Sequence, residues 1–188
     1  MKIVKDEKGF SIVELVIILA IMAVLGSVMF YSFTLVTGQY ARECANNLSA
    51  SLNKEKNYAL TRSATVDCYM ELVKDSDGYR AKYYVPKNAI TETEWELAEE
   101  QSIGKERVGV VCTLDGGGMI TLAPGQSVKF VYNRSSGAMK GIVSADGATD
   151  GLPDVITQKC DSITILHGRE YKIQLYPATG KHELSRVD

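Results

Sequence analysis

The sequence predicts an α+β protein in which a long N-terminal helix packs against an antiparallel β-sheet head. Aliphatic residues concentrate at the start of the chain, up to about Val36, and a helical pattern of small apolar residues follows them. From Ala64 onward the pattern changes to short β-like runs that are separated by tight turns. These patterns indicate an apolar anchor that is joined to a globular part.

The first segment is an apolar run in which Glu14 is the only charged residue between Phe10 and Val36. As a helix this run is about 40 Å long, which exceeds the roughly 30 Å thickness of a hydrocarbon core. Three lysines lie among the first nine residues, and the first basic residue after the run is Arg42. Because positive charge tends to stay on the cytoplasmic side, we expect the first nine residues inside and the remainder across the membrane.

A cleaved secretory signal is the alternative interpretation of this run. Such a signal has an apolar core of about 7–15 residues and ends in a cleavage site of small residues. The run observed here is longer, and no site of that kind closes it. The pattern therefore favours an anchor that stays with the chain.

The segment "KGFSIVEL" resembles the type IV prepilin motif: a short basic leader that ends in Gly9, followed by Phe10 and by Glu14 at the fifth position. The resemblance implies that a prepilin peptidase cleaves between Gly9 and Phe10 and N-methylates the new Phe10 amine. It divides the chain into a cytoplasmic leader peptide (1–9), a transmembrane and assembly helix (10–36), an amphipathic half of that helix (37–62) and a globular β-rich head (63–188).

Glu14 is expected to be an assembly residue. A carboxylate within a bilayer costs about 2.5–3.5 kcal/mol on insertion scales, and an ammonium partner offsets that cost. Phe10 and Glu14 are four residues apart, so a helix places them on one face. The resemblance implies that the partner in a filament is the Phe10 amine of a neighbouring subunit. The alternative is a plain anchor in which Glu14 reaches the lipid headgroups.

The second half of the helix carries a stripe of small apolar residues. The stripe consists of Ala41, Ala45, Leu48, Leu52 and Ala59. Polar residues are expected mostly on the other faces: Arg42, Glu43, Asn46, Lys54 and Glu55. No proline occurs before Pro86, so we expect one helix from about Phe10 to about Leu60, with Gly26 and Gly38 as places for bending or local melting.

The head is expected to contain short antiparallel strands and hairpins, of which residues 64–73 and 79–85 form the first. Thr91–Gln101 is predicted to form a short helix, with Trp95 filling the core. The order of elements is similar to minor pilins and to H-type pseudopilins of type II secretion. That resemblance implies two sheets and a closing hairpin at Ile163–Gly180, and residues 141–158 stand outside it as an insertion.

Catalysis is not expected, because the two histidines, His167 and His182, have no visible Ser or Cys partner and no hydrolase, metalloprotease or phosphate-loop motif occurs. No cofactor is expected either. The exception is a weak calcium hypothesis, in which Asp146, Asp150 and Asp154 of a Gly-rich loop supply hard oxygen ligands. The alternative is an ordinary solvated acidic loop.

The four cysteines, Cys44, Cys68, Cys112 and Cys160, form no CxxC pair, so zinc binding is not expected. If the head lies outside the cytoplasm, a disulfide is permitted, and Cys112 with Cys160 is the first candidate pair. Reduced, buried thiols remain the alternative.

The expected function is that of a structural subunit, a minor pilin or pseudopilin of a type IV pilus or type II secretion filament. The implied partners are prepilin peptidase, other pilin subunits, an assembly platform with its ATPase, and membrane lipid. A single-pass inner-membrane location with an extracytoplasmic head follows. One alternative is a membrane-anchored extracytoplasmic binding protein without a filament role.

A DNA-binding minor pilin is the other alternative. Its one hint is a group of strand residues, Tyr79, Arg80, Lys82, Tyr83 and Tyr84. The formal net charge of −2 and the absence of a basic block argue against it, so no nucleic acid is expected among the partners.

Overall fold

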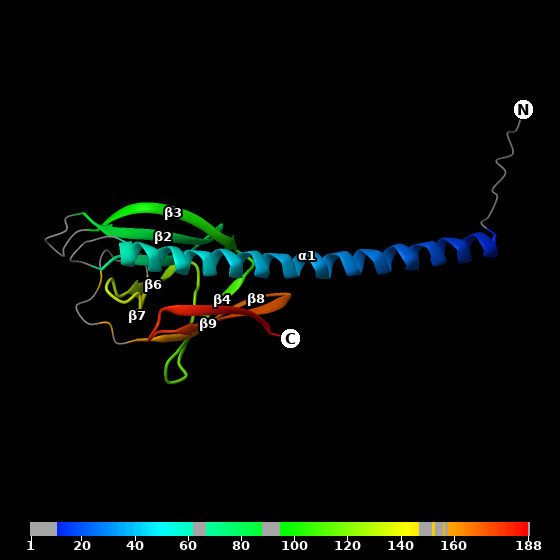
Figure 1. Ribbon diagram of the computed structural model, residues 1–188. Coiled ribbons are helices and arrows are strands. Elements are labelled where there is room, and N and C mark those ends of the chain that lie inside the picture. The colour runs from blue at the N-terminus through cyan, green and yellow to red at the C-terminus, as the bar shows by residue number, and fades with distance from the viewer. Residues whose placement is uncertain are drawn as a thin grey trace, which may run out of the picture. The chain divides into compact units, whose positions relative to one another are not determined.

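The computed structural model describes residues 11–61, 67–87, 95–146, 152, 156 and 158–187. The chain divides into two compact units, Met1–Val36 and Thr37–Asp188. Figure 1 shows the elements in order. They are α1 (Ile12–Thr61), β1 (Tyr69–Asp75), β2 (Gly78–Pro86), β3 (Trp95–Lys105), β4 (Gly109–Leu114), β5 (Met119–Thr121), β6 (Gln126–Tyr132), β7 (Met139–Asp146), β8 (Cys160–His167), β9 (Arg169–Tyr176) and β10 (Lys181–Val187).

The helix α1 confirms the prediction of one long helix, because it runs without interruption from Ile12 to Thr61. It passes through both Gly26 and Gly38. A methyl group added at Gly26 would meet nothing within 4 Å, whereas one added at Gly38 would lie 2.8 Å from Cδ of Arg169. Gly38 is therefore a point of close approach between α1 and the first residue of β9.

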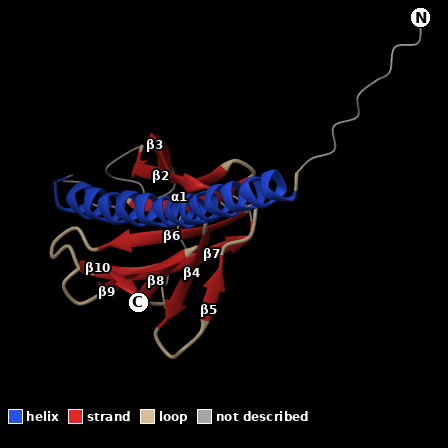
Figure 2. Ribbon diagram, turned by 90° about the vertical axis from the view of Figure 1, so that its right-hand side faces the viewer, coloured by secondary structure: helices blue, strands red, loops and turns tan. Residues whose placement is uncertain are grey.

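The described residues of the head form two five-stranded sheets. We call them sheet A, in the order β3-β2-β1-β6-β7, and sheet B, in the order β10-β9-β8-β4-β5. All of the strand pairs within them are antiparallel. The prediction of an antiparallel head next to a long helix is confirmed, and the head has the second sheet that the resemblance implied (Figure 2).

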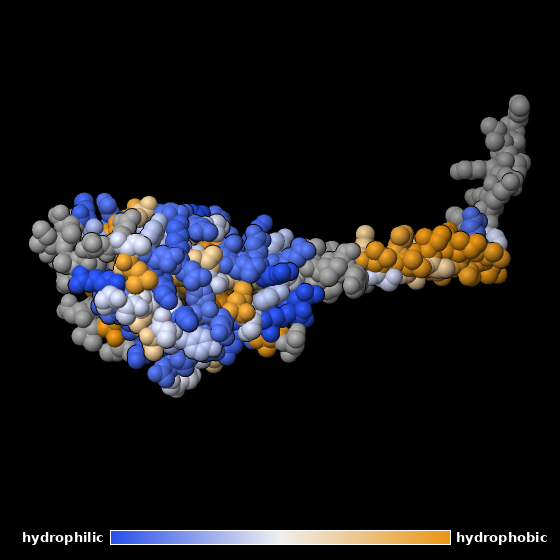
Figure 3. Space-filling model, viewed as in Figure 1, coloured by the Kyte–Doolittle hydropathy of each residue, from blue (hydrophilic) through white to orange (hydrophobic). Residues whose placement is uncertain are grey.

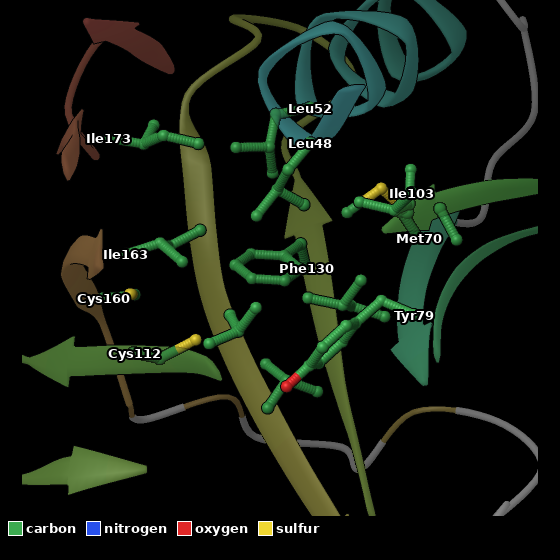
Figure 4. Packing of buried hydrophobic residues seen from close by; sticks show 14 of the residues in the cluster. Leu48, Leu52, Met70, Tyr79, Ile103, Cys112, Phe130, Cys160, Ile163 and Ile173 are labelled. Carbon is green, nitrogen blue, oxygen red and sulfur yellow. The ribbon is translucent and has the colours of Figure 1, made fainter. Parts of the chain in front are cut away.

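The core of the head lies where the stripe on α1 meets the inner faces of both sheets. Leu48 and Leu52 of α1 are fully buried, as are Phe130 of sheet A and Ile163 of sheet B (Figure 4). All five predicted stripe residues are buried. Fully burying a Leu, Ile or Phe side chain contributes about 1.5–3 kcal/mol to the stability of the fold. The helix is thus the third layer of the head, which explains why its stripe continues to Ala59.

Two predictions for the segment around Trp95 are wrong. Residues 95–101 form part of β3 instead of a helix, and residues 91–94 lie outside the described residues. Pairing along the whole of β2 outweighs the helix propensity of Glu, Leu and Ala. Trp95 is only partly buried; its Nε1–H donates to the Asp67 carbonyl at 3.2 Å, and its ring meets Tyr69 edge-on.

β3 has two register shifts against β2, and one of them places Ile103 and Gly104 against α1. Ile103 is buried, and its carbonyl accepts a hydrogen bond from Nδ2 of Asn47 at 3.1 Å. A Cβ atom at Gly104 would lie 2.6 Å from Sγ of Cys44, well inside contact distance. Only a glycine allows β3 and α1 to approach so closely.

Gly104→Ala should therefore destabilise the head by about 1–3 kcal/mol, the usual cost of overpacking a core. Gly109→Ala is the matched control, because its methyl would meet only Leu166, at an ordinary 3.7 Å. Chemical unfolding of the detergent-solubilised chain, followed by the fluorescence of its single tryptophan, measures both variants. Equal stability of the two variants would contradict the close approach.

Candidate functional site

The start of α1 is built as a capped helix terminus. The Val13 N–H donates to Oγ of Ser11 at 3.3 Å, and the Leu15 N–H donates to the Ser11 carbonyl at 3.1 Å. Ser11 is therefore the N-cap, and Glu14 is the third helical residue, as in a Ser-x-x-Glu capping box. Ser11 is a residue of the site that was not predicted, although the four-residue signal from Ser11 to Glu14 is present in the sequence.

Glu14 is exposed in the first turn of α1, where the helix dipole favours a negative charge. Its side chain makes no hydrogen bond or ion pair with the described residues. The residues that follow it on the same face, Ile17, Ile18 and Ile21, are apolar and between 44% and 54% exposed. The carboxylate thus lies at one end of an apolar surface that its own chain leaves uncovered.

The apolar surface extends from Ile12 to Met29, and no residue of this stretch is buried (Figure 3). Its one hydroxyl group, Ser27 Oγ, donates to the Val24 carbonyl at 2.7 Å and is satisfied within the helix. By length and composition, this stretch is the one part of the described chain that is able to cross a membrane, a property that signal sequences share.

Gly9 and Phe10, the predicted cleavage and methylation residues, lie outside the described residues. The predicted placement of Phe10 and Glu14 on one helix face therefore stays a prediction. The described helix begins at Ile12, two residues after Phe10.

The comparison with protein families identifies this segment. Residues 4–30 match the model of the prokaryotic N-terminal methylation motif. This match supports assignment of the chain to the type IV pilin-like family. The motif is that of pilins and pseudopilins that prepilin peptidase processes, and an inner-membrane anchor fits this motif and the apolar helix that carries it. No curated protein and no solved structure matches the chain.

One histidine of the head has a serine partner, contrary to the sequence-based expectation. Nε2 of His182 lies 2.9 Å from Oγ of Ser49 and 3.1 Å from the Ser49 carbonyl. Nδ1 of His182 is buried and has no hydrogen-bond partner among the described residues, so none of these residues supplies the acid that orients the ring in a catalytic triad. The contact instead joins β10 to α1 across 133 positions of sequence.

Glu55 was expected on an outer face of the helix, and this expectation is wrong. It is fully buried because it continues the stripe three residues after Leu52 and four before Ala59. Burial, followed by the negative charge of Glu55, raises the pKa of the Tyr132 phenol. Glu55 thus places a carboxylate beside tyrosines of the core.

The four cysteines are buried as free thiols. The thiols of Cys112 and Cys160 are in hydrogen-bonding contact, and this contact, followed by burial, raises the pKa of Cys112 well above its usual value. Burial, followed by the charge of Glu43, raises the pKa of Cys44 to about 12. The structure therefore brings the predicted pair together, and their disulfide stays a prediction.

The predicted calcium ligands fall mostly outside the described residues. Asp150 and Asp154 lie there, and Asp146 is the last residue of β7, opposite Gln126. Within the described part of the chain, no group of three or more His, Cys, Asp or Glu side chains could hold a metal ion. The calcium site stays a prediction.

The hint of a DNA-binding surface is not supported by the side-chain positions. Tyr79 and Tyr83 are fully buried in the core, so their rings are not free to stack on bases. Tyr84 stacks on Tyr69 with ring centroids 4.8 Å apart. Arg80 is held by ion pairs to three carboxylates, those of Asp75, Asp77 and Glu100.

His182 predicts a pH dependence of the stability of the head. Burial lowers its pKa below the usual value, and the hydrogen bond to Ser49 opposes this only in part. The unfolded chain therefore takes up the proton first as the pH falls. Neutral His182 makes its full contribution to the free energy of unfolding above the pKa of the unfolded chain, about 6.5. This contribution is lost as the pH falls from that value through the lower pKa of the folded chain.

Denaturant unfolding between pH 7.5 and pH 5 measures this loss. His182→Gln is the control, because the amide N–H can still reach the Ser49 carbonyl but does not titrate. The variant should lose less stability than the wild type over this range. If the two lose the same amount, His182 is not the titrating group.

Proposed function

We propose that the chain is a structural subunit, a minor pilin or pseudopilin, that enters a type IV pilus or type II secretion filament after removal of residues 1–9. The observation that carries this proposal is the methylation motif at residues 4–30, joined to a helix with one carboxylate on an uncovered apolar surface. Its role is assembly, and the proposal assigns it no catalytic activity.

The surface of Ile12–Met29 limits where this segment is stable. Its large apolar side chains are exposed within the chain, so they need lipid or other apolar helices around them. Moving from lipid into a helix bundle gains little hydrophobic energy, because lipid tails are as apolar as leucine. Close packing and polar pairs must therefore select the position of one subunit next to another.

Glu14 is the residue that is able to supply such a selection. Cleavage after Gly9 creates a cationic amine on Phe10, and a neighbouring Glu14 carboxylate is its natural partner. A single buried ion pair among apolar contacts fixes the register of packed helices, because any other register leaves a charge unpaired. Within the described chain, Glu14 has no competing ion pair.

The head supports assignment to the minor, H-type group. Its last three strands form two consecutive hairpins, and the first of these, β8 with β9, lies within the closing hairpin that the resemblance implied at Ile163–Gly180; Ile163 pairs with Ile173 in it. Its two sheets pack with α1 into one core. Such subunits serve adhesion, twitching, DNA uptake or protein secretion, with a platform ATPase as the assembly partner.

Gly9→Ala tests processing. We expect the variant to keep its leader, because the peptidase no longer finds a glycine immediately before the cleavage site. Mass spectrometry of the N-terminal peptide from cells should find a methylated Phe10 in the wild type and residues 1–9 in the variant. A plain membrane-anchored binding protein predicts an identical N-terminus for both.

Glu14→Gln tests assembly separately from processing. The amide keeps the shape of the side chain and removes its charge, so incorporation into filaments should fall about tenfold or more, equivalent to at least about 1.4 kcal/mol. Glu43→Gln, which changes an exposed residue of α1 within the head, is the matched control. Incorporation is measured as the amount of each variant in the filaments that are sheared from cells. If the Glu14→Gln variant is shown to be cleaved and still enters filaments as well as the wild type does, the assembly role is refuted.

A further inference from the structure

Two turns of the head meet α1 at the first residues of the second unit. The β8–β9 turn brings Arg169 over Gly38, and His167 lies with its ring centroid 6.0 Å from that of Tyr40. The β3–β4 turn places Nζ of Lys105 over the same Tyr40 ring at 5.4 Å. We call this region the collar, formed by Gly38, Tyr40, Arg42, residues 105–107 and residues 167–169.

The collar is rich in cations that the head does not neutralise. Arg42, Lys105, Arg107 and Arg169 are all exposed, and none forms an ion pair with the described residues. Three carboxylates lie in or next to the same segments, those of Glu43, Glu106 and Glu170. Four cations against three carboxylates leave an excess of positive charge at the collar, whereas the whole chain has a formal net charge of −2.

Chain length keeps the collar near a membrane surface, whatever the orientation of the head. Gly38 follows Met29, the last residue of the candidate span among the described residues, by nine residues, and α1 is helical throughout this interval. Nine helical residues rise about 13.5 Å. The headgroup layer on each side of a bilayer is about 5–8 Å thick, so the collar lies within about one Debye length of it.

We propose that the collar binds anionic phospholipid headgroups and thereby holds the head against the membrane before the subunit is assembled. Each lysine or arginine near an anionic surface contributes about 1 kcal/mol to membrane binding. A few such contacts are therefore enough to favour the membrane-bound position of the head and still allow its release. Tyr40 suits the same place, because tyrosine is favoured at the membrane interface. The proposal rests on the membrane anchoring of the proposed function and does not require filament assembly.

Hydrogen exchange of the full-length chain in lipid nanodiscs tests this proposal. The discs contain either phosphatidylcholine alone or phosphatidylcholine mixed with phosphatidylglycerol. We expect peptides that cover residues 104–108 and 166–170 to exchange several-fold more slowly on the anionic discs. The protection should disappear in about 1 M salt, where the Debye length is about 3 Å.

Two double variants make the test specific. Arg107→Gln with Arg169→Gln removes two collar charges, and Lys172→Gln with Lys181→Gln removes two charges from sheet B that also lack ion pairs within the described chain. Only the first pair should abolish the protection, and equal thermal midpoints show that both fold. Equal exchange on the two kinds of disc, or equal loss in both double variants, would overturn the proposal. The N-terminal mass of the same protein reports separately on processing.

Discussion

One helix has to satisfy two surroundings, and the rest of the structure follows from this constraint. Over Ile12–Met29, α1 is apolar on all sides apart from Glu14 and Ser27, and none of these residues is buried by the chain. From Ala41 to Ala59 only one stripe is apolar, and both sheets close over that stripe. The first pattern requires lipid or other helices, whereas the second requires a head. The change in periodicity within one element separates the anchor from the globular part.

Patterns that are local in sequence predicted most of the fold. The stripe on α1 and the tight turns between strands depend on residues a few positions apart, and the structure confirms them. The local propensity of Glu and Ala predicted a helix at residues 95–101. These residues form a strand instead, because they pair with β2, and local propensity carries no information about that pairing. Glu55 was misplaced for a similar reason, since its charge suggested solvent although its spacing from Leu52 placed it in the core.

The candidate site, like the fold, was predictable where its residues are neighbours in sequence and not where they are distant. The motif around Glu14 is contiguous, and its recognition needed only the sequence; the Ser11 cap was equally local and was overlooked. The contact of His182 with Ser49, and the collar, join residues that are more than sixty positions apart. No spacing rule brings such residues together, because sheet order and strand register determine their distances.

The contact between His182 and Ser49 has a consequence for the order in which the chain folds during synthesis. β10 is the last strand of the described residues, yet it packs onto α1, the element that is synthesised first. Sheet B is incomplete until those final residues have been delivered, and contacts between such distant residues form slowly. During synthesis the chain therefore passes through a stage in which the apolar stripe of α1 is partly uncovered. Under the proposed function, a filament that accepts only closed heads would gain quality control from the order of synthesis alone.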